Sequence, residues 1–275
     1  MRAKERKFKA KFMIQEIFIY CALFGGIAGL LAGLFGIGGG VVLVPFFLWL
    51  FTEQGFSQET VMHSAIATSL ATIIITSVAS VTAHHRLGSV MWEIVYKLAP
   101  GVFIGAIVGA ALADHLPTES LRLFFAAYLF IVGVEMAIQW QPKQAKAQMS
   151  FTMLRFSGLV IGILSSILGI GGGTLTVPLL SRYNYLMRNA VAISSACGLP
   201  IAISSTLSFA ILGWNKTGLP EGSTGYVYWP AFIGIILTST LMAPVGAKLA
   251  HKVPTKILKR FFSLLVFAIT LKMVW

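Results

Sequence analysis

Charged residues are scarce in this chain. They make up 11% of its 275 residues, whereas 57% are hydrophobic. A soluble globular protein carries about a quarter charged residues, so this chain has too few to cover a surface that faces water. Acidic residues are the scarcest, with 9 Asp and Glu against 21 Lys and Arg. The composition therefore excludes an ordinary soluble domain and indicates a protein that faces lipid.

Cysteine is almost absent as well. Cys21 and Cys197 both lie in apolar segments, where we expect small buried side chains and neither a disulfide nor a metal site. The spacing of the histidines fits no recurrent zinc pattern. The sequence also lacks a nucleophile elbow, an HExxH motif, a P-loop and paired intramembrane aspartates. We therefore expect no metal, no cofactor and no enzymatic activity.

What the chain has instead is a series of apolar runs of about 20 residues, the length that spans a bilayer. They predict an all-α polytopic membrane protein with about eight hydrophobic segments. We expect a basic cytoplasmic leader at 1–13, a first transmembrane repeat at 14–140, a linker at 141–152 and a second repeat at 153–275. The positive charge of the leader favours a cytoplasmic N-terminus for this multi-pass protein of the cell (inner or plasma) membrane. The net charge of +12 lies mostly in Lys and Arg that flank the spans, so no nucleic-acid partner is expected.

One motif occurs twice inside apolar segments. The sequence GIGGG stands at 36–40 and again at 169–173, and an apolar run with a proline follows each copy at the same distance, at Pro45 and Pro178. Glycine in a helix interior costs about 1 kcal/mol relative to alanine. Two matched clusters therefore predict helices that are broken inside the membrane.

A second duplication lies away from these glycines. Residues 109–125 align without a gap with residues 246–262, so the two halves are homologous. The aligned turns carry opposite charge, with Asp114 and Glu119 in the first half against Lys252 and Lys256 in the second. Opposite charge favours inverted repeats, as found in many transporters. Four spans in each half would instead make the repeats parallel, because an even number of spans returns the chain to the same side of the membrane. Inversion needs an odd number, which results if the two pieces of each split glycine segment cross or re-enter the membrane separately.

The broken helices suggest an anion site. A half-helix that begins in mid-membrane presents free N–H groups and a partial positive charge to a ligand, and hydroxyls on neighbouring spans can donate further hydrogen bonds. The candidate substrate-binding residues are Gly36, Gly38, Gly39, Gly40, Thr68, Ser69, Gly169, Gly171, Gly172, Gly173, Ser194 and Ser195. The alternatives are that these glycines only allow close helix packing and that the hydroxyls only bond between helices.

Two further features complete the pattern. Glu135 is a carboxylate at membrane depth and a candidate for coupling to protons, although it lies near the end of its span and could also reach the interface. Gly101, Gly105 and Gly109 recur every four residues, which predicts a smooth helix face for close packing.

The paired glycine clusters with their prolines, the Thr68-Ser69 and Ser194-Ser195 pairs, and the two Gly-x-x-Leu-Ala-x-x-x-Pro turns resemble the TauE/SafE family of membrane transporters. The resemblance covers nearly the whole chain after the leader. It implies a secondary transporter, and more specifically an exporter, of a small sulfur-containing anion such as sulfite or an organosulfonate. It also implies that the glycine clusters line a central anion path. A passive anion channel and a non-transporting scaffold or accessory subunit are the alternatives. The sequence fixes neither the anion, the direction of transport, the coupling ion nor the oligomeric state.

Overall fold

The computed structural model describes residues 2–35, 39–138, 149–250 and 255–274, with side chains for 16–32, 39–138, 149–246, 249, 260 and 263–273. Within these ranges the chain forms ten α-helices and one antiparallel two-stranded hairpin. In chain order the elements are α1 (Arg2–Phe35), α2 (Gly40–Glu53), α3 (Val61–Arg86), α4 (Trp92–Asp114), α5 (Thr118–Ile138), α6 (Phe151–Leu168), α7 (Gly173–Arg182), α8 (Met187–Leu212), β1 (Ser223–Thr224), β2 (Val227–Tyr228), α9 (Trp229–Ala250) and α10 (Thr255–Val274).

Six of these described helices are long and apolar enough to cross a membrane, namely α3, α4, α5, α6, α8 and α9. Shorter apolar stretches lie in α1, α2 and α10. The chain is therefore an all-α polytopic membrane protein, as predicted. The ten helices differ from the eight expected segments because each glycine motif divides one segment into two helices.

Both predicted helix breaks are confirmed. Helix α1 ends at Phe35 and α2 begins at Gly40, while α6 ends at Leu168 and α7 begins at Gly173. Helices α2 and α7 have 14 and 10 residues, or about 21 and 15 Å at 1.5 Å per residue. Neither can span ~30 Å of hydrocarbon alone.

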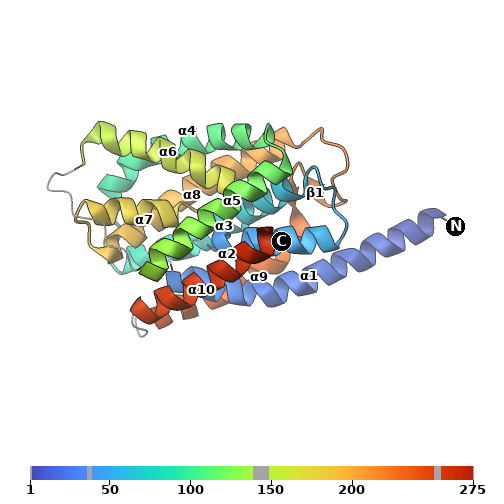
Figure 1. Cartoon of the computed structure of the whole chain (residues 1–275), viewed down its shortest axis with the longest axis horizontal. Coiled ribbons are helices and arrows are strands. Elements are labelled where there is room, and N and C mark those ends of the chain that lie inside the picture. Colours follow the sequence, from blue (N-terminus) through green and yellow to red (C-terminus); the bar gives the residue numbers. More distant parts are fainter. Residues whose placement is uncertain (1, 36–38, 139–148, 251–254, 275) are drawn as a thin grey trace.

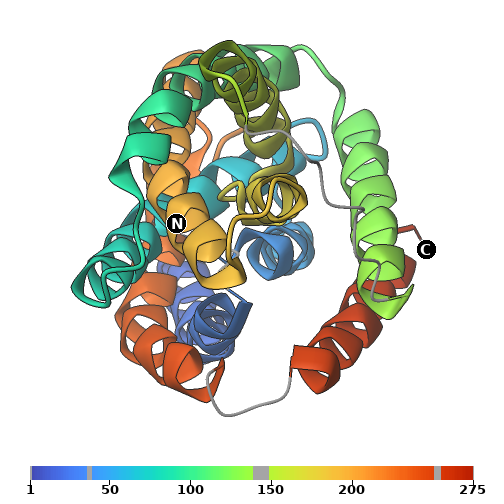
Figure 2. The same cartoon turned by 90° about the vertical axis from the view of Figure 1, so that its left-hand side faces the viewer.

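These two short helices lie at the centre of the bundle (Figure 2). We call the right-hand end of Figure 1, where α2 ends and α3 begins, end A, and the left-hand end, where α3 ends and α4 begins, end B. Helices α1 and α2 enter from end A and return to it, whereas α6 and α7 do the same from end B (Figure 1). The two glycine motifs therefore approach the centre from opposite ends.

Glycine faces clamp two parallel helix pairs. A Cβ atom added at Gly101, Gly105 or Gly109 of α4 would overlap the backbone of α6, which includes Arg155 and Leu159. The predicted close packing of this face is confirmed. Helices α1 and α9 meet in the same way, because Gly25 and Gly29 press against the α9 backbone and Gly234 presses against the α1 backbone.

Two other pairs are antiparallel. Helices α3 and α8 lie side by side, and Ser80 Oγ of α3 donates to Ser195 Oγ of α8 across 3.1 Å. Helix α5 packs along α10, where Phe130 and Phe267 meet edge to face. The pair of α5 and α10 stands at one side of the bundle (Figure 2). Both cysteines are buried and unbonded, as expected.

The close backbone contact between α4 and α6 leaves no room for a side chain at Gly105. We expect Gly105→Val to destabilise the protein by about 1–3 kcal/mol or more, because a larger side chain must separate two backbones that touch. The recovery and melting temperature of purified protein, read by size-exclusion chromatography and a thermal ramp, would measure this. Ile104→Val is the matched control, since Ile104 is exposed on the same helix. Equal melting temperatures for the two variants would contradict the packing argument.

Candidate functional site

The second glycine motif ends one helix and starts the next. Gly169 has φ 69°, the left-handed conformation that glycine adopts without strain. The N–H of Ile170 donates to the carbonyl of Ser165 at 3.0 Å, which satisfies a carbonyl at the end of α6. Gly172, with φ 74°, then caps α7, as Gly39, with φ 79°, caps α2. Backbone geometry therefore requires glycine at the first and fourth positions of the second motif and at the fourth position of the first motif.

The glycine at the fifth position of the motif has a different role, which is close approach. A Cβ atom at Gly40 would lie 2.5 Å from the carbonyl oxygen of Gly169 and 2.8 Å from Cα of Ile170. The start of α2 therefore touches the second motif directly. Ser69 Oγ of α3 donates to the same Gly169 oxygen at 2.9 Å. We call this contact of Gly40, Ser69 and Gly169–Ile170 the central crossing.

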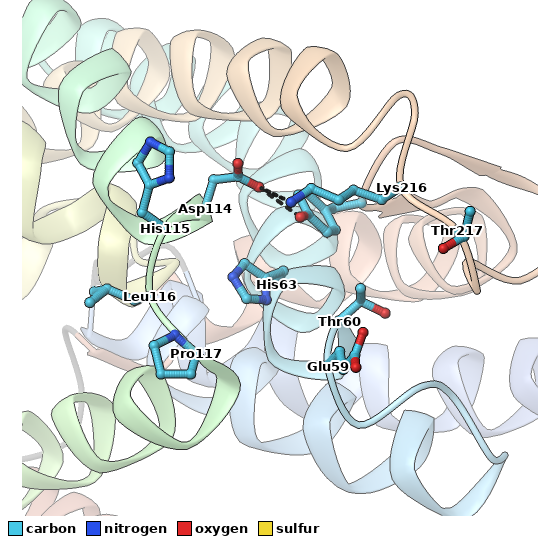
Figure 3. Close-up of a pocket in the computed structure, with 10 residues that line it drawn as sticks. Glu59, Thr60, His63, Asp114, His115, Leu116, Pro117, Lys216 and Thr217 are labelled. Atoms are coloured by element: carbon cyan, nitrogen blue, oxygen red, sulfur yellow. Dashed lines mark hydrogen bonds and ion pairs between the residues drawn. The ribbon is translucent and has the colours of Figure 1, made fainter.

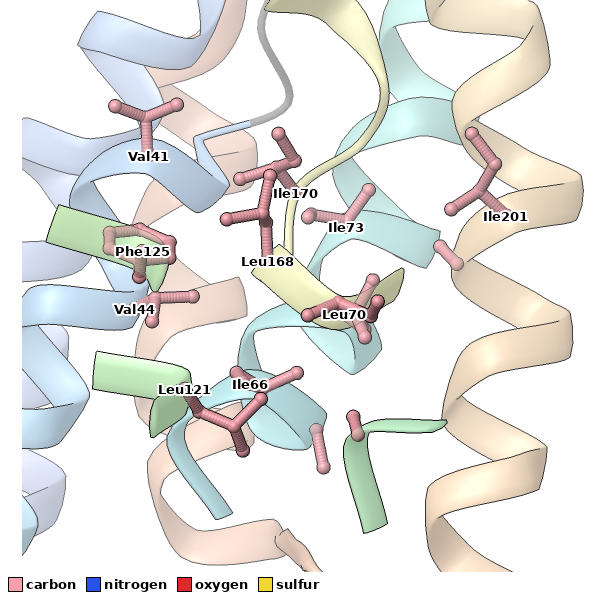
Figure 4. Close-up of a cluster of buried hydrophobic side chains, with 14 of the residues drawn as sticks. Val41, Val44, Ile66, Leu70, Ile73, Leu121, Phe125, Leu168, Ile170 and Ile201 are labelled. Atoms are coloured by element: carbon pink, nitrogen blue, oxygen red, sulfur yellow. The ribbon is translucent and has the colours of Figure 1, made fainter. Parts of the chain in front are cut away.

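Apolar side chains surround the central crossing (Figure 4). Val41 and Val44 of α2 lie on one side of Leu168 and Ile170, and Leu70 and Ile73 of α3 lie on the other. All of these side chains are buried. Polar groups at the crossing are therefore shielded from water, which strengthens any electrostatic interaction that they make.

Several buried hydroxyls near the second motif have no hydrogen-bond partner within the part of the chain that the structure describes. They are Ser165, Thr176 and Ser194. Ser165 Oγ lies 3.4 Å from an ideal Cβ position at Gly172. Ser194 lies one turn from Gly198, whose Cα faces the carbonyl oxygen of Gly171. An unpartnered buried hydroxyl is costly, so hydroxyls beside a glycine break are candidates to bind a ligand.

Other predicted site residues have structural partners. Thr68 Oγ1 accepts a hydrogen bond from the backbone N–H of Tyr228 at 3.1 Å, and Ser195 Oγ accepts the bond from Ser80 described above. The two Ser/Thr pairs that look equivalent in the sequence thus make different contacts. Gly173 is the buried first residue of α7. Gly36 and Gly38 lie outside the described residues.

Glu135 is half-buried on α5. Its carboxylate interacts electrostatically with Tyr128, two turns earlier on the same helix. The hydroxyl of Tyr128 contacts Thr174 Oγ1 in the first turn of α7. A chain of polar groups thus runs from Glu135 to the start of the short helix.

A pocket of about 340 Å³ opens at end A (Figure 3). We call it the end-A pocket. It is lined by Glu59, Thr60, His63, Asp114, His115, Leu116, Pro117, Lys216, Thr217 and Tyr226. These residues come from the start of α3, the turn between α4 and α5, and the connection between α8 and α9, so the pocket joins both halves of the chain.

Asp114 is the centre of the hydrogen bonding in this pocket. Tyr226 OH donates to its Oδ1 at 2.7 Å, and Lys216 Nζ lies 3.6 Å from the same oxygen. Burial raises the pKa of the Tyr226 phenol, and the hydrogen bond to Asp114 and its negative charge raise it further. Tyr226 therefore remains a hydrogen-bond donor at neutral pH.

Sequence reasoning missed this pocket. His63 and Asp114 are 51 positions apart in one half, and Lys216 and Tyr226 lie in the loop of the other half. The one available signal was an ionisable histidine, His63, at the start of an apolar span. Among the described residues, no group of three or more His, Cys, Asp or Glu side chains could hold a metal ion.

Comparison with known proteins agrees with this architecture. The family described as "Sulfite exporter TauE/SafE" matches residues 21–273. A "Probable membrane transporter protein" of Haemophilus influenzae is 35% identical over 93% of this chain and 97% of its own length. A protein of Methanocaldococcus jannaschii with a similar name is 25% identical over 89% of each chain. No solved structure gives a significant match. The chain therefore belongs to the TauE/SafE family and is a membrane transporter.

Proposed function

We propose that the protein is a secondary transporter that exports a small sulfur-containing anion, such as sulfite or an organosulfonate, by alternating access. The observation that carries this proposal is the meeting of the two helix breaks at the bundle centre, where Gly40 at the start of α2 touches Gly169 and Ile170, between the end of α6 and the start of α7. The first N–H groups of a helix have no partner within it and favour an anion. The description of the family supports the sulfur chemistry.

The unpartnered hydroxyls are the second support. Nothing in the protein accepts from or donates to the side chains of Ser165 and Ser194 among the described residues. An anion oxygen at the crossing would accept hydrogen bonds from them. A hydrogen bond to a charged group is worth about 1.5–3 kcal/mol, so these hydroxyls would contribute to affinity without fixing a charge in the membrane.

We further propose that the two halves are inverted repeats. In chain order α1 corresponds to α6, and α4 corresponds to α9. The parallel pair of α4 and α6 therefore corresponds to the parallel pair of α9 and α1. Helix α3 corresponds to α8 and α5 corresponds to α10, so each antiparallel pair joins a helix to its own counterpart in the other half. This is the pattern that a twofold axis in the membrane plane produces.

The proposal includes a cytoplasmic N-terminus in the cell membrane and protons as coupling ion, with Glu135 as a coupling group. The leader charge favours this orientation. The opposite orientation is favoured by basic residues at helix ends at end B, namely Arg86, Arg155, Arg182 and Arg188. The two charge patterns predict opposite orientations, and the labelling experiment below distinguishes them.

Replacing the unpartnered hydroxyls tests transport. We expect Ser165→Ala and Ser194→Ala each to weaken the apparent affinity for sulfite or thiosulfate about tenfold to a hundredfold in proteoliposomes, from the hydrogen-bond energy above. The melting temperature should stay equal or rise, because a buried unpartnered group is removed. Ser204→Ala is the matched control, since Ser204 Oγ donates within its own helix to Pro200 O at 2.7 Å.

These hydroxyl variants are cleaner than changes at Gly39 or Gly172, whose positive φ would add backbone strain of about 1–2 kcal/mol for any other residue. Unchanged affinity in both serine variants would contradict the central site. Flux that does not saturate and ignores a proton gradient would indicate a channel. No anion flux at all would indicate a scaffold or accessory subunit.

Labelling tests the inversion and the orientation together. Gln58→Cys and Leu186→Cys place a thiol in the loops after α2 and α7, and both native cysteines are buried. We expect a membrane-impermeant maleimide to label Leu186→Cys in intact cells and Gln58→Cys only after permeabilisation. The reverse pattern would put end A outside. Labelling of both from the same side would refute inverted repeats.

A further inference from the structure

The end-A pocket contains a histidine that can bind a proton and has no partner for it. His63 is 3% exposed, and its ring stacks on Tyr226 with centroids 5.1 Å apart. Nε2 lies 3.0 Å from the carbonyl oxygen of Ala113. A carbonyl only accepts, so Nε2 carries the hydrogen in the neutral ring. Nδ1 is then a buried lone pair, and it has no partner in the described part of the protein.

Protonation changes what this ring can do. A proton at Nδ1 turns a buried acceptor into a charged donor. The charge of Asp114 and the backbone of Leu116 favour the charged ring, but Nδ1 has no hydrogen-bond partner among the described residues. A buried charged donor without an acceptor is unfavourable, so the protonated ring calls for an acceptor in the pocket. An anion oxygen would supply that acceptor and would also neutralise the charge.

The charged groups around His63 determine the net charge of the pocket. Asp114 of α4 faces it with a side chain that is 11% exposed, and Lys216 of the α8–α9 connection is 45% exposed. Glu59 and His115 line the pocket at exposed positions, and Tyr226 is neutral as argued above. Two carboxylates against one lysine disfavour an anion while His63 is neutral. Protonated His63 removes that imbalance.

Lys216 is placed to serve the same ligand. Its Nζ lies 3.6 Å from Asp114 Oδ1, an ion pair longer than a hydrogen bond, while Tyr226 already donates to that oxygen. The ammonium group therefore retains donors for a ligand. His63 and Lys216 both lie in the wall of the pocket (Figure 3).

From this geometry we propose that the end-A pocket is an outer binding station for the transported oxyanion, held by Lys216 and by Nδ1 of a protonated His63, so that one proton binds with each anion. The proposal rests on the proposed transport function and adds to it a second site, with its own proton acceptor. The proton comes from the surrounding water and is released with the anion. No covalent step is involved.

The pocket chemistry is specific to one end of the chain. The register that aligns Ser69 with Ser195 also aligns His63 with Asn189, and Asp114 aligns with His251. Asparagine does not titrate. Proton-linked binding through a buried histidine at the start of this helix is therefore expected at end A, and Asn189 does not provide it at the equivalent start of α8.

The test is anion binding to the purified full-length protein over a pH series from about 8 down to 5, which spans the ordinary titration of a histidine. Burial disfavours the charged imidazole, so the gain in affinity is expected toward the acid end of the series. Sulfate and thiosulfate are suitable probes because both stay fully ionised over this range. We expect the wild-type affinity to increase as the pH falls, by up to about tenfold per pH unit where one proton accompanies the anion. His63→Gln, which keeps a donor for the Ala113 carbonyl, should bind about tenfold more weakly at acidic pH with no pH dependence.

Matched variants separate the roles. Lys216→Gln should weaken binding at every pH but keep the slope. His115→Gln and His85→Gln, one in the pocket and one near the opposite end of α3, should keep both affinity and slope. A wild-type slope in His63→Gln, or loss of the slope in His115→Gln, would overturn the proposal.

A second measurement needs no variant. Thiosulfate added to wild-type protein in weakly buffered solution should raise the pH by an amount that corresponds to one proton per bound anion. Binding without proton uptake would overturn the end-A proposal and leave the transport function intact. Absence of any binding or flux of sulfite, sulfate and thiosulfate would instead count against the proposed transport function itself.

Discussion

A helix that ends inside a bilayer leaves backbone groups without water, and this constraint organises the whole bundle. At the second glycine break the chain meets it by burying the irregular backbone in protein. Gly169 satisfies the end of α6 through its left-handed φ, and Ser69 of α3 donates to the Gly169 carbonyl. Helix α2 closes the other side, because Gly40 lets it touch the motif. Irregular backbone at this depth is thus enclosed on every described side by helices α2, α3 and α8.

The polar groups of the protein lie in two regions, the centre of the bundle and end A. Hydroxyls and backbone amides, without full charges, lie at the centre near Ser165 and Gly172. The full charges of Asp114 and Lys216 lie at end A, nearer to water. The division follows the cost of moving charge into hydrocarbon, which is high at the centre and small at the interface. A site built in this way can hold an anion at depth by dipoles after charges have attracted it at the surface.

Much of the fold could be read from the sequence because it depends on local rules. The GIGGG motifs predicted the helix breaks because glycine disfavours a helix interior. The four-residue spacing of Gly101, Gly105 and Gly109 predicted a closely packed helix face. The partners of these features could not be read. Nothing local says that α4 meets α6, or that Thr68 bonds to Tyr228 while Ser69 bonds to Gly169. The end-A pocket was missed for the same reason, since Asp114 and Tyr226 meet only when both halves have folded.

The glycine clamps have a consequence for how the protein is made. Helix α1 packs along α9, and α4 packs along α6. In both pairs a helix of the first half makes close backbone contact with a helix of the second half, which is synthesised later. The first five helices alone would leave the faces of Gly25, Gly29 and Gly105 open to lipid. Close helix packing in this structure therefore joins the two sequence halves. Assembly must wait for the last helices to enter the membrane, and any motion that exchanges access between the two ends must carry mixed pairs of helices drawn from both halves.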